Sequence, residues 1–85
     1  MELSEETVRM LESGEVIDRE GIYEILTSAA VETYEVLDKN GKHFAYFSCN
    51  GQWYRIEYEI CQGAYALRPQ RAFKVSKTET GWESL

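Results

Sequence analysis

Cysteine, histidine and proline are scarce in this chain, with two, one and one copies among 85 residues. Two cysteines are too few for a disulfide framework, so we expect free thiols and a reducing compartment, the cytoplasm of a bacterial or similar host cell. Because His43 is the only histidine, sites that need two or more histidines are excluded. Two cysteines and one histidine at these spacings also match no zinc-ligand pattern. We therefore expect neither a metal nor a cofactor.

A long apolar run and a basic N-terminus are also missing. A membrane helix needs roughly 18 apolar residues, and no segment approaches that length. Signal peptides begin with basic residues, whereas Glu2, Glu5 and Glu6 make this N-terminus acidic. We expect no membrane segment and no secretion signal.

Catalytic motifs are absent as well. The six glycines are scattered and form no phosphate-binding loop. A Cys-His pair is disfavoured because Cys49 lies six residues from His43, about 20 Å along a strand, and Cys61 would come closer only if the chain after Ile60 folds back. Glu57 and Glu59 would lie about 7 Å apart on one strand face, but a small open sheet offers no evident cleft for them. We expect that the protein is not an enzyme.

The composition describes one globular, acidic domain. A chain of 85 residues can bury one core but not two, so we predict a single compact domain over residues 1–85. Fifteen acids against nine bases give a net charge of -6, which disfavours direct binding to nucleic acid. Residues 1–42 hold 11 acids and four bases, whereas residues 43–85 hold four acids and five bases, so the acidity lies in the N-terminal half.

Two short helices are predicted in that half. Ser4 is a good N-cap, Glu5 and Glu6 suit the first turn, and Gly14 suits the position after the helix end. A second helix follows the N-cap Asp18. Its apolar residues recur at i, i+3, i+4 and i+7, as a helix packed on one side requires: Ile22, Ile25, Leu26 and Ala29.

From Val31 onward the period changes to two, and two Asn-Gly dipeptides predict tight hairpins. A two-residue loop at Asn40-Gly41 would place Val36 opposite Ala45 and Glu35 opposite Tyr46. A second loop at Asn50-Gly51 would pair residues 43–49 with 52–58 in the same way. After Ile60 we predict a turn at residues 61–63, a short strand at 64–67, a turn or edge at 68–71 and a last strand at 72–80.

Side-chain alternation divides this sheet into two faces. The predicted core face contains Tyr34, Val36, Ala45, Phe47, Cys49, Tyr54, Ile56, Tyr58 and Ile60. The fold we predict is α+β, with two short N-terminal helices, an antiparallel meander of four to five strands, and the second helix packed on the core face. Trp82, in the unclassified last five residues, is expected to anchor the tail to the sheet.

The opposite face combines aromatic and charged residues, as interaction hot spots do. Its candidate binding residues are Glu35, Phe44, Tyr46, Trp53, Arg55 and Glu57. Two plainer readings stay open at this point: cross-strand packing on a half-exposed sheet, or cover by the C-terminal strands.

The first functional hypothesis is a small acidic inhibitor that covers a basic surface, such as a nucleic-acid groove, of a partner protein. The acids expected to steer it are Glu5, Glu6, Glu12, Glu15, Asp18, Glu20 and Glu24, together with Glu2. Phage anti-defence proteins, antitoxins and immunity proteins share this size and acidity, which is a likeness of bulk properties without a shared motif.

The alternative is a module that binds a nucleotide-like anion. Trp53 and Tyr46 would stack on the ligand and Arg55 would pair with its charge, while Arg68, Arg71, Lys74 and Lys77 could face a phosphate. A homo-oligomer formed through an edge strand is a third possibility.

Overall fold

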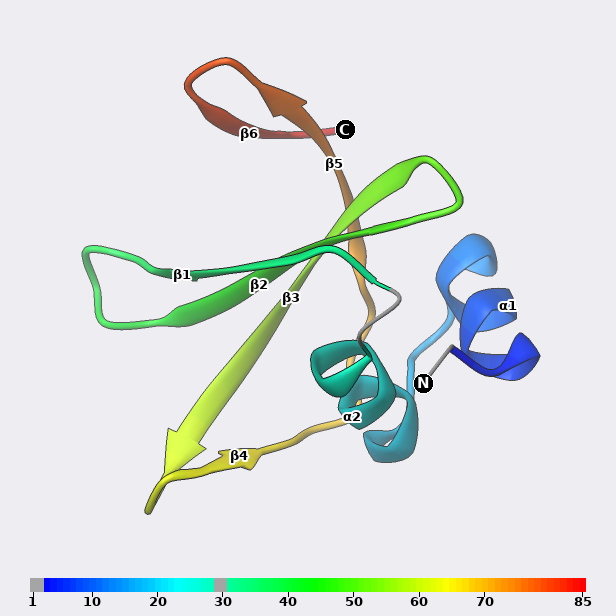
Figure 1. The fold of residues 1–85 in the computed structure, drawn as a ribbon, viewed down its shortest axis with the longest axis horizontal. Helices are drawn as coiled ribbons and strands as arrows, with labels where there is room; N and C mark the ends of the chain where they lie inside the picture. Colours follow the sequence, from blue (N-terminus) through cyan, green and yellow to red (C-terminus); the bar gives the residue numbers. More distant parts are fainter. Residues whose placement is uncertain (1–2, 29–30) are drawn as a thin grey trace.

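The computed structural model describes residues 3–28 and 31–85, so Glu2 of the predicted acidic set and Ala29 of the predicted helix stripe lie outside the described residues. Two helices are followed by strands that form an antiparallel sheet, which confirms the α+β class (Figure 1). The elements are α1 (Glu5–Ser13), α2 (Arg19–Thr27), β1 (Thr33–Leu37), β2 (His43–Cys49), β3 (Gln52–Cys61), β4 (Ala64–Ala66), β5 (Phe73–Thr78) and β6 (Gly81–Ser84).

Both helices begin as their N-cap residues predict, and α1 also ends as predicted. The Ser4 side chain accepts a hydrogen bond from the backbone N–H of Thr7, and Gly14 takes the left-handed conformation after α1. Asp18 caps α2 by accepting from the N–H of Gly21 at 2.8 Å. The carboxylate of Glu24 in α2 then accepts from the buried Thr7 hydroxyl at 2.7 Å, so the two helices are joined side by side.

The sheet follows the order β1-β2-β3-β5-β6, and β4 pairs with β3 beside β5. The predicted meander is therefore present, with one strand more than the upper count of five. The additional strand is β6, which comes from the segment that the sequence left unclassified. β3 is long enough to pair with β5 through residues 53–55 and with β4 through residues 59–61.

The two Asn-Gly hairpins differ in their outcome. At Asn50-Gly51 both residues have positive φ, and the predicted pairing of residues 43–49 with 52–58 is confirmed. At Asn40-Gly41 the predicted register is wrong by one residue, because Val36 faces Phe44 instead of Ala45. The Asp38 carboxylate accepts from the N–H groups of Asn40 and Lys42, which closes a three-residue loop in place of the two-residue one.

This shift moves every residue of β1 to the opposite face. Tyr34 and Val36, both predicted in the core, are 41% and 38% exposed on the other face, and Ile60 at the far end of β3 is 51% exposed. The remaining core prediction holds for the centre of the sheet, where five residues are buried: Ala45, Phe47, Tyr54, Ile56 and Tyr58.

One buried cluster unites these sheet residues with apolar side chains from the helical part, namely Met10, Leu11, Ile17, Ile22 and Ile25. The helices and the centre of the sheet therefore share a hydrophobic core. The placement of α2 flat across the sheet face stays a prediction.

Candidate functional site

The sheet face that points away from this buried cluster is lined by aromatic residues, and we call it the aromatic face. Directly opposed residues of an antiparallel pair lie on the same face. The pairing opposes Tyr34 to Tyr46, Tyr46 to Arg55, and Arg55 to Phe73. Four neighbouring strands, β1, β2, β3 and β5, thus contribute to one surface.

One end of the aromatic face is closed by four rings, three of which lie around a single ammonium group. Trp82 of β6 stacks on Tyr46 with ring centroids 4.5 Å apart and contacts Trp53 at 4.9 Å. The Lys77 Nζ lies 4.9 Å from the ring centre of Tyr34, 5.2 Å from that of Trp53 and 5.8 Å from that of Trp82. These contacts are cation–π interactions, and the chain supplies both the rings and the cation.

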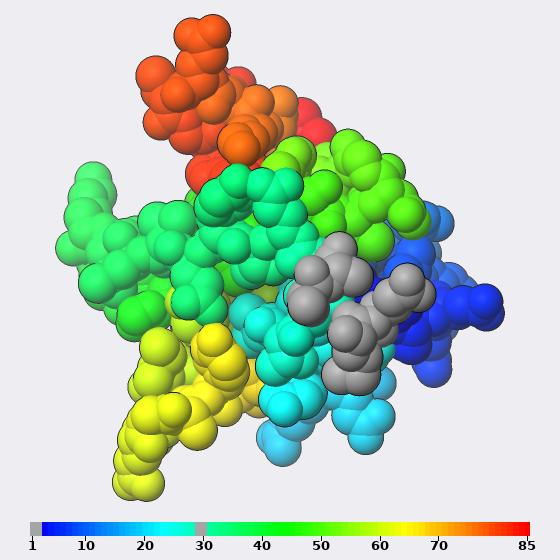
Figure 2. Space-filling view, viewed as in Figure 1, coloured from blue at the N-terminus to red at the C-terminus, as the bar shows by residue number. Residues whose placement is uncertain are grey.

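The sheet curls around this end. β1 and β6 are separated by three strands, and neighbouring strands lie about 4.8 Å apart, so a flat sheet would hold them about 19 Å apart. The rings of Tyr34 and Trp82 are only 6.1 Å apart. In Figure 2 the β5–β6 hairpin, orange to red, lies against the green β1. Val75, which pairs with Trp53, is 2% exposed beneath these rings.

The other end of the aromatic face is open. The Arg55 guanidinium carbon lies 5.2 Å from the ring centre of Phe44 and 5.9 Å from that of Phe73. Phe73 is 59% exposed and Val36 is 38% exposed. Within residues 3–28 and 31–85 the ion pairs are Arg9–Glu15 and Arg68–Glu59, so Arg55 has no acidic partner there.

The structure brings together most of the predicted sheet-face residues. Phe44, Tyr46, Trp53 and Arg55 lie on the aromatic face, as does Glu57, which opposes Phe44. Glu35 does not, because the register of β1 places it opposite the buried Ala45, and its carboxylate accepts from the Tyr65 hydroxyl at 3.0 Å.

Sequence reasoning missed four residues of this face: Tyr34, Phe73, Lys77 and Trp82. Trp82 was expected to anchor the tail, and its contacts with β2 and β3 agree with that. The open alternative of cover by the C-terminal strands is therefore correct for the closed end of the face. A long-range contact of this kind leaves no local pattern that would have identified Lys77 as its partner.

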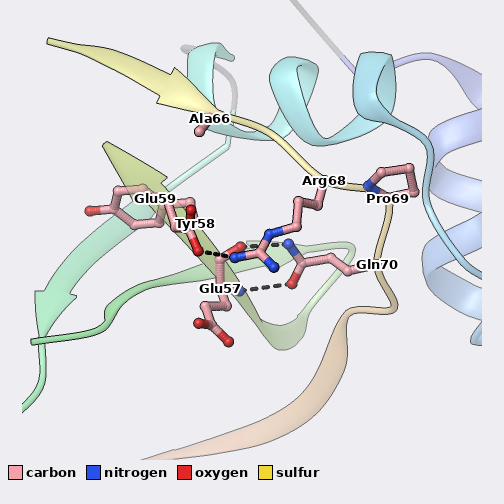
Figure 3. A pocket seen from close by; sticks show the side chains of 7 residues that line it. All are labelled: Glu57, Tyr58, Glu59, Ala66, Arg68, Pro69 and Gln70. Carbon is pink, nitrogen blue, oxygen red and sulfur yellow. Dashed lines mark hydrogen bonds and ion pairs between the residues drawn. The ribbon is translucent and has the colours of Figure 1, made fainter. Parts of the chain in front are cut away.

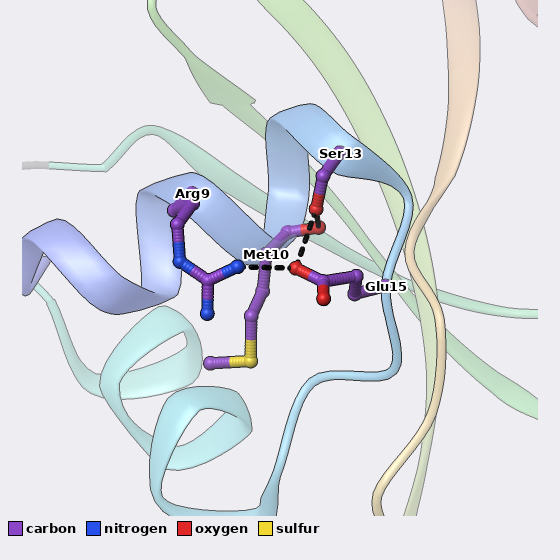
Figure 4. Close-up of polar contacts among 4 residues, drawn as sticks. All are labelled: Arg9, Met10, Ser13 and Glu15. Atoms are coloured by element: carbon purple, nitrogen blue, oxygen red, sulfur yellow. Dashed lines mark hydrogen bonds and ion pairs between the residues drawn. The ribbon is translucent and has the colours of Figure 1, made fainter.

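Some of the predicted steering acids are used inside the fold. Asp18 caps α2, and Glu24 bonds to Ser4 and Thr7. Glu15 accepts from Ser13 and pairs with Arg9 at 2.5 Å (Figure 4). The Ser13 hydroxyl first, and then the Arg9 charge, lower the pKa of the Glu15 carboxyl below its ordinary value.

The other helical acids are directed to solvent. Glu12 accepts from the Asn50 amide at 3.3 Å and is exposed. Glu5, Glu6 and Glu20 are exposed and have no hydrogen bond or ion pair with any residue that the structure describes. An exposed acidic surface with few cations therefore remains on the helical half.

The pockets of the described chain are shallow and polar. Figure 3 shows one of about 230 Å³, lined by residues of β3, by Ala66 at the end of β4 and by the segment that follows, in which Arg68 points to Glu59. Ligand pockets span roughly 300–1,000 Å³ and are mainly apolar. Another hollow, of about 400 Å³, includes His43 and Tyr58, whose predicted pairing is confirmed with rings 5.3 Å apart.

Metal-binding and membrane features were sought in residues 3–28 and 31–85. No three His, Cys, Asp or Glu side chains gather there, and neither helix has the length and apolarity to cross a bilayer. Cys49 and Cys61 are free thiols. Burial first, and then the Glu12 charge, raise the pKa of the Cys49 thiol.

Comparison with known proteins adds no functional assignment. No family model matches this sequence, and no curated protein or solved structure matches it.

Proposed function

We propose that this chain is a small acidic inhibitor that binds a partner protein and covers a basic surface which handles nucleic acid. The observation that carries the proposal is the separation of charge along the fold. Residues 3–28 hold seven acids and two bases, and one of the two bases, Arg9, is paired with Glu15. The helices therefore form an anionic surface without the clustered cations that phosphate binding needs.

Exposed acids of this kind act mainly on the rate of association. They attract a basic partner over about a Debye length, roughly 8–10 Å at physiological salt. Glu5, Glu6 and Glu20 supply this attraction, because internal hydrogen bonds do not engage them in the described chain. A protein of the anti-defence, antitoxin or immunity type would use such a field to compete with nucleic acid for its target.

The contact that holds the complex is assigned to the aromatic face. We place α2 across the opposite face of the sheet, a placement supported by the buried cluster that Ile22 and Ile25 share with Phe47 and Ile56. The aromatic face is then the one left for a partner. Its aromatic and arginine content is that of an interface core.

The alternative, a nucleotide-binding module, has less support. The rings that would stack on a base, Tyr46 and Trp53, already contact Trp82, and Trp53 also contacts the Lys77 ammonium. A ligand would have to displace these groups. The hollows of the described residues are more polar than the mainly apolar pockets that hold planar ligands, which gives this alternative less support.

The test is affinity capture from host lysate at low and high salt, followed by mass spectrometry and measurement of association rates. We expect a basic, nucleic-acid-handling protein to be retained at low salt and its association to slow as salt rises. Replacing Glu5 and Glu6 with Lys should reduce the association rate about tenfold or more at low salt.

The matched control replaces Glu79 and Glu83 with Lys, which changes the net charge equally but lies on the β5–β6 hairpin. Equal effects of the two double variants would contradict an acidic helical interface. Retention of a small anion in native mass spectrometry, with no protein captured, would favour the nucleotide-binding alternative instead.

A further inference from the structure

We propose that Arg55 is the anchor of the interface and binds a carboxylate of the partner protein at the open end of the aromatic face. This inference rests on the proposed function, because it assumes that the partner is a protein. It goes further by naming the residue that holds the complex and the chemical group that this residue recognises.

The first support is the arrangement of the guanidinium group. Its carbon lies over the rings of both Phe44 and Phe73, which come from β2 and β5 on either side of β3. Stacking on rings restrains the guanidinium plane and leaves its five N–H donors around the edge of that plane. A carboxylate can accept two of these donors in parallel, which is the geometry that arginine recognises best.

The second support is that these donors have no acceptor in the fold. Arg55 forms no ion pair and no hydrogen bond with any residue among 3–28 and 31–85. It is nevertheless half-buried, in contrast to Arg9 and Arg68, which are exposed and paired with acids. A half-buried cation without an acid is available for an external one.

The surroundings favour a single carboxylate over a polyanion. Glu57 lies two residues further along the same face of β3, and the chain as a whole carries a net charge of -6. Both repel an extended phosphate backbone. The rings of Phe44 and Phe73 around Arg55 would exclude water from a bound carboxylate, and a charge-assisted hydrogen bond gains strength when water is excluded.

The experiment uses the full chain labelled with ¹⁵N and benzoate as the probe, since benzoate offers a carboxylate together with an aromatic ring. The Arg side-chain Nε–H signals are followed by NMR at constant ionic strength, with acetate and inorganic phosphate as comparison anions. We expect saturable shifts of the Arg55 signal with benzoate, weaker shifts with acetate, and the weakest with phosphate.

Variants distinguish bidentate hydrogen bonding by the Arg55 guanidinium from attraction by its positive charge alone. Arg55→Ala should abolish the saturable shifts, monitored on neighbouring amides, and Arg55→Lys should weaken binding at least about fivefold because a lysine lacks the bidentate fork. Phe73→Ala keeps the Arg55 charge and removes one ring. It should weaken the binding of benzoate more than the binding of acetate. Arg71→Ala, at an exposed position of the segment before β5, is the matched control and should bind as the wild type does.

Three outcomes would overturn the assignment: no saturable shift in the wild type, equal binding by Arg55→Ala, or tighter binding of phosphate than of either carboxylate. The Glu5 and Glu6 double variant separates this inference from the proposed function, because it should bind benzoate normally while losing association rate with the captured partner. If benzoate does not bind but capture of the partner protein still depends on Glu5 and Glu6, the role of Arg55 is wrong and the proposed function is unaffected.

Discussion

The side-chain amide of Gln70 binds the backbone of Glu57 in place of a neighbouring strand. Its Oε1 accepts from the Glu57 N–H at 2.9 Å, and its Nε2 donates to the Glu57 carbonyl. Glu57 lies between the parts of β3 that pair with β5 and with β4. The backbone of Gln70 also pairs with Ile17, in the link between the helices, so one residue joins that link to the centre of the sheet.

Replacing Gln70 with Ala should therefore destabilise the fold by about 2 kcal/mol, since it leaves two backbone groups of Glu57 without partners. Gln70→Glu keeps the acceptor oxygen but loses the N–H donor. Its free energy of unfolding should therefore lie between those of the wild type and Gln70→Ala. Urea unfolding followed by circular dichroism measures the change. The control is Arg71→Ala, an exposed neighbour that should change the free energy of unfolding by less than about 0.5 kcal/mol. Equal values for the two alanine variants would contradict this role.

Gly21 of α2 leaves little room for a side chain. A Cβ there would lie 2.5 Å from Cγ2 of Ile17 and 3.3 Å from Oγ1 of Thr7. Alanine favours a helix by about 1 kcal/mol over glycine, but overpacking costs about 1–3 kcal/mol, and the β-branched Ile17 cannot turn away easily. We expect Gly21→Ala to lower the melting temperature. In a double-mutant cycle, Ile17→Ala should remove most of that penalty, and strict additivity would show that the overlap is relieved elsewhere.

The two hairpins show how far local sequence determines this fold. Asn50-Gly51 forms the predicted two-residue loop, because both residues adopt the positive φ that this tight turn requires. Asn40-Gly41 carries the same dipeptide, yet it lies in a longer loop in which the Asp38 carboxylate accepts from two N–H groups, and the faces of β1 are reversed. The length of the loop at Asn40-Gly41 and the contacts of Trp82 with other strands both depend on side-chain interactions that a periodic sequence pattern does not encode.

Asp38 is thus expected to select the register of β1. Asp38→Ala removes the acceptor of two N–H groups and should cost about 1 kcal/mol, and it should increase the population of pairings in which Val36 faces Ala45. Asp38→Asn keeps an acceptor oxygen and should retain most of the wild-type register. Interstrand NOEs between Val36 and Phe44 measure that register. Their survival at full intensity in Asp38→Ala would show that packing, and not this carboxylate, determines the pairing.

The closed end of the aromatic face should depend on packing more than on charge. Trp82→Ala removes the ring that contacts Tyr46, Trp53 and Tyr34 and uncovers Val75, so we expect a loss of about 2–3 kcal/mol, less than for a fully buried tryptophan. Lys77→Met keeps the stem but removes the cation and should cost only about 0.5–1 kcal/mol. Thermal unfolding compares the two variants, and a larger loss for Lys77→Met would reverse this order.

Alkaline pH should destabilise the protein through its tyrosines. Burial raises the pKa of Tyr54 and Tyr58, and hydrogen bonds to Glu32 and Glu35 raise the pKa of Tyr34 and Tyr65 above the ordinary value of 10.0. A raised pKa in the folded state means that folding favours the neutral phenol. This stability is complete below the unfolded pKa and is lost as pH rises through the folded pKa.

Urea midpoints measured from about pH 8 to about pH 11.5 should therefore decline above pH 10, in a Cys49→Ala background so that the raised pKa of that thiol does not contribute. Tyr54→Phe in the same background should show a smaller decline, because a buried phenol no longer has to ionise. Absorbance near 295 nm should show tyrosine ionisation that becomes complete only as the protein unfolds. A midpoint that is independent of pH over this range, or a decline unchanged by Tyr54→Phe, would show that the buried phenol of Tyr54 does not link ionisation to folding.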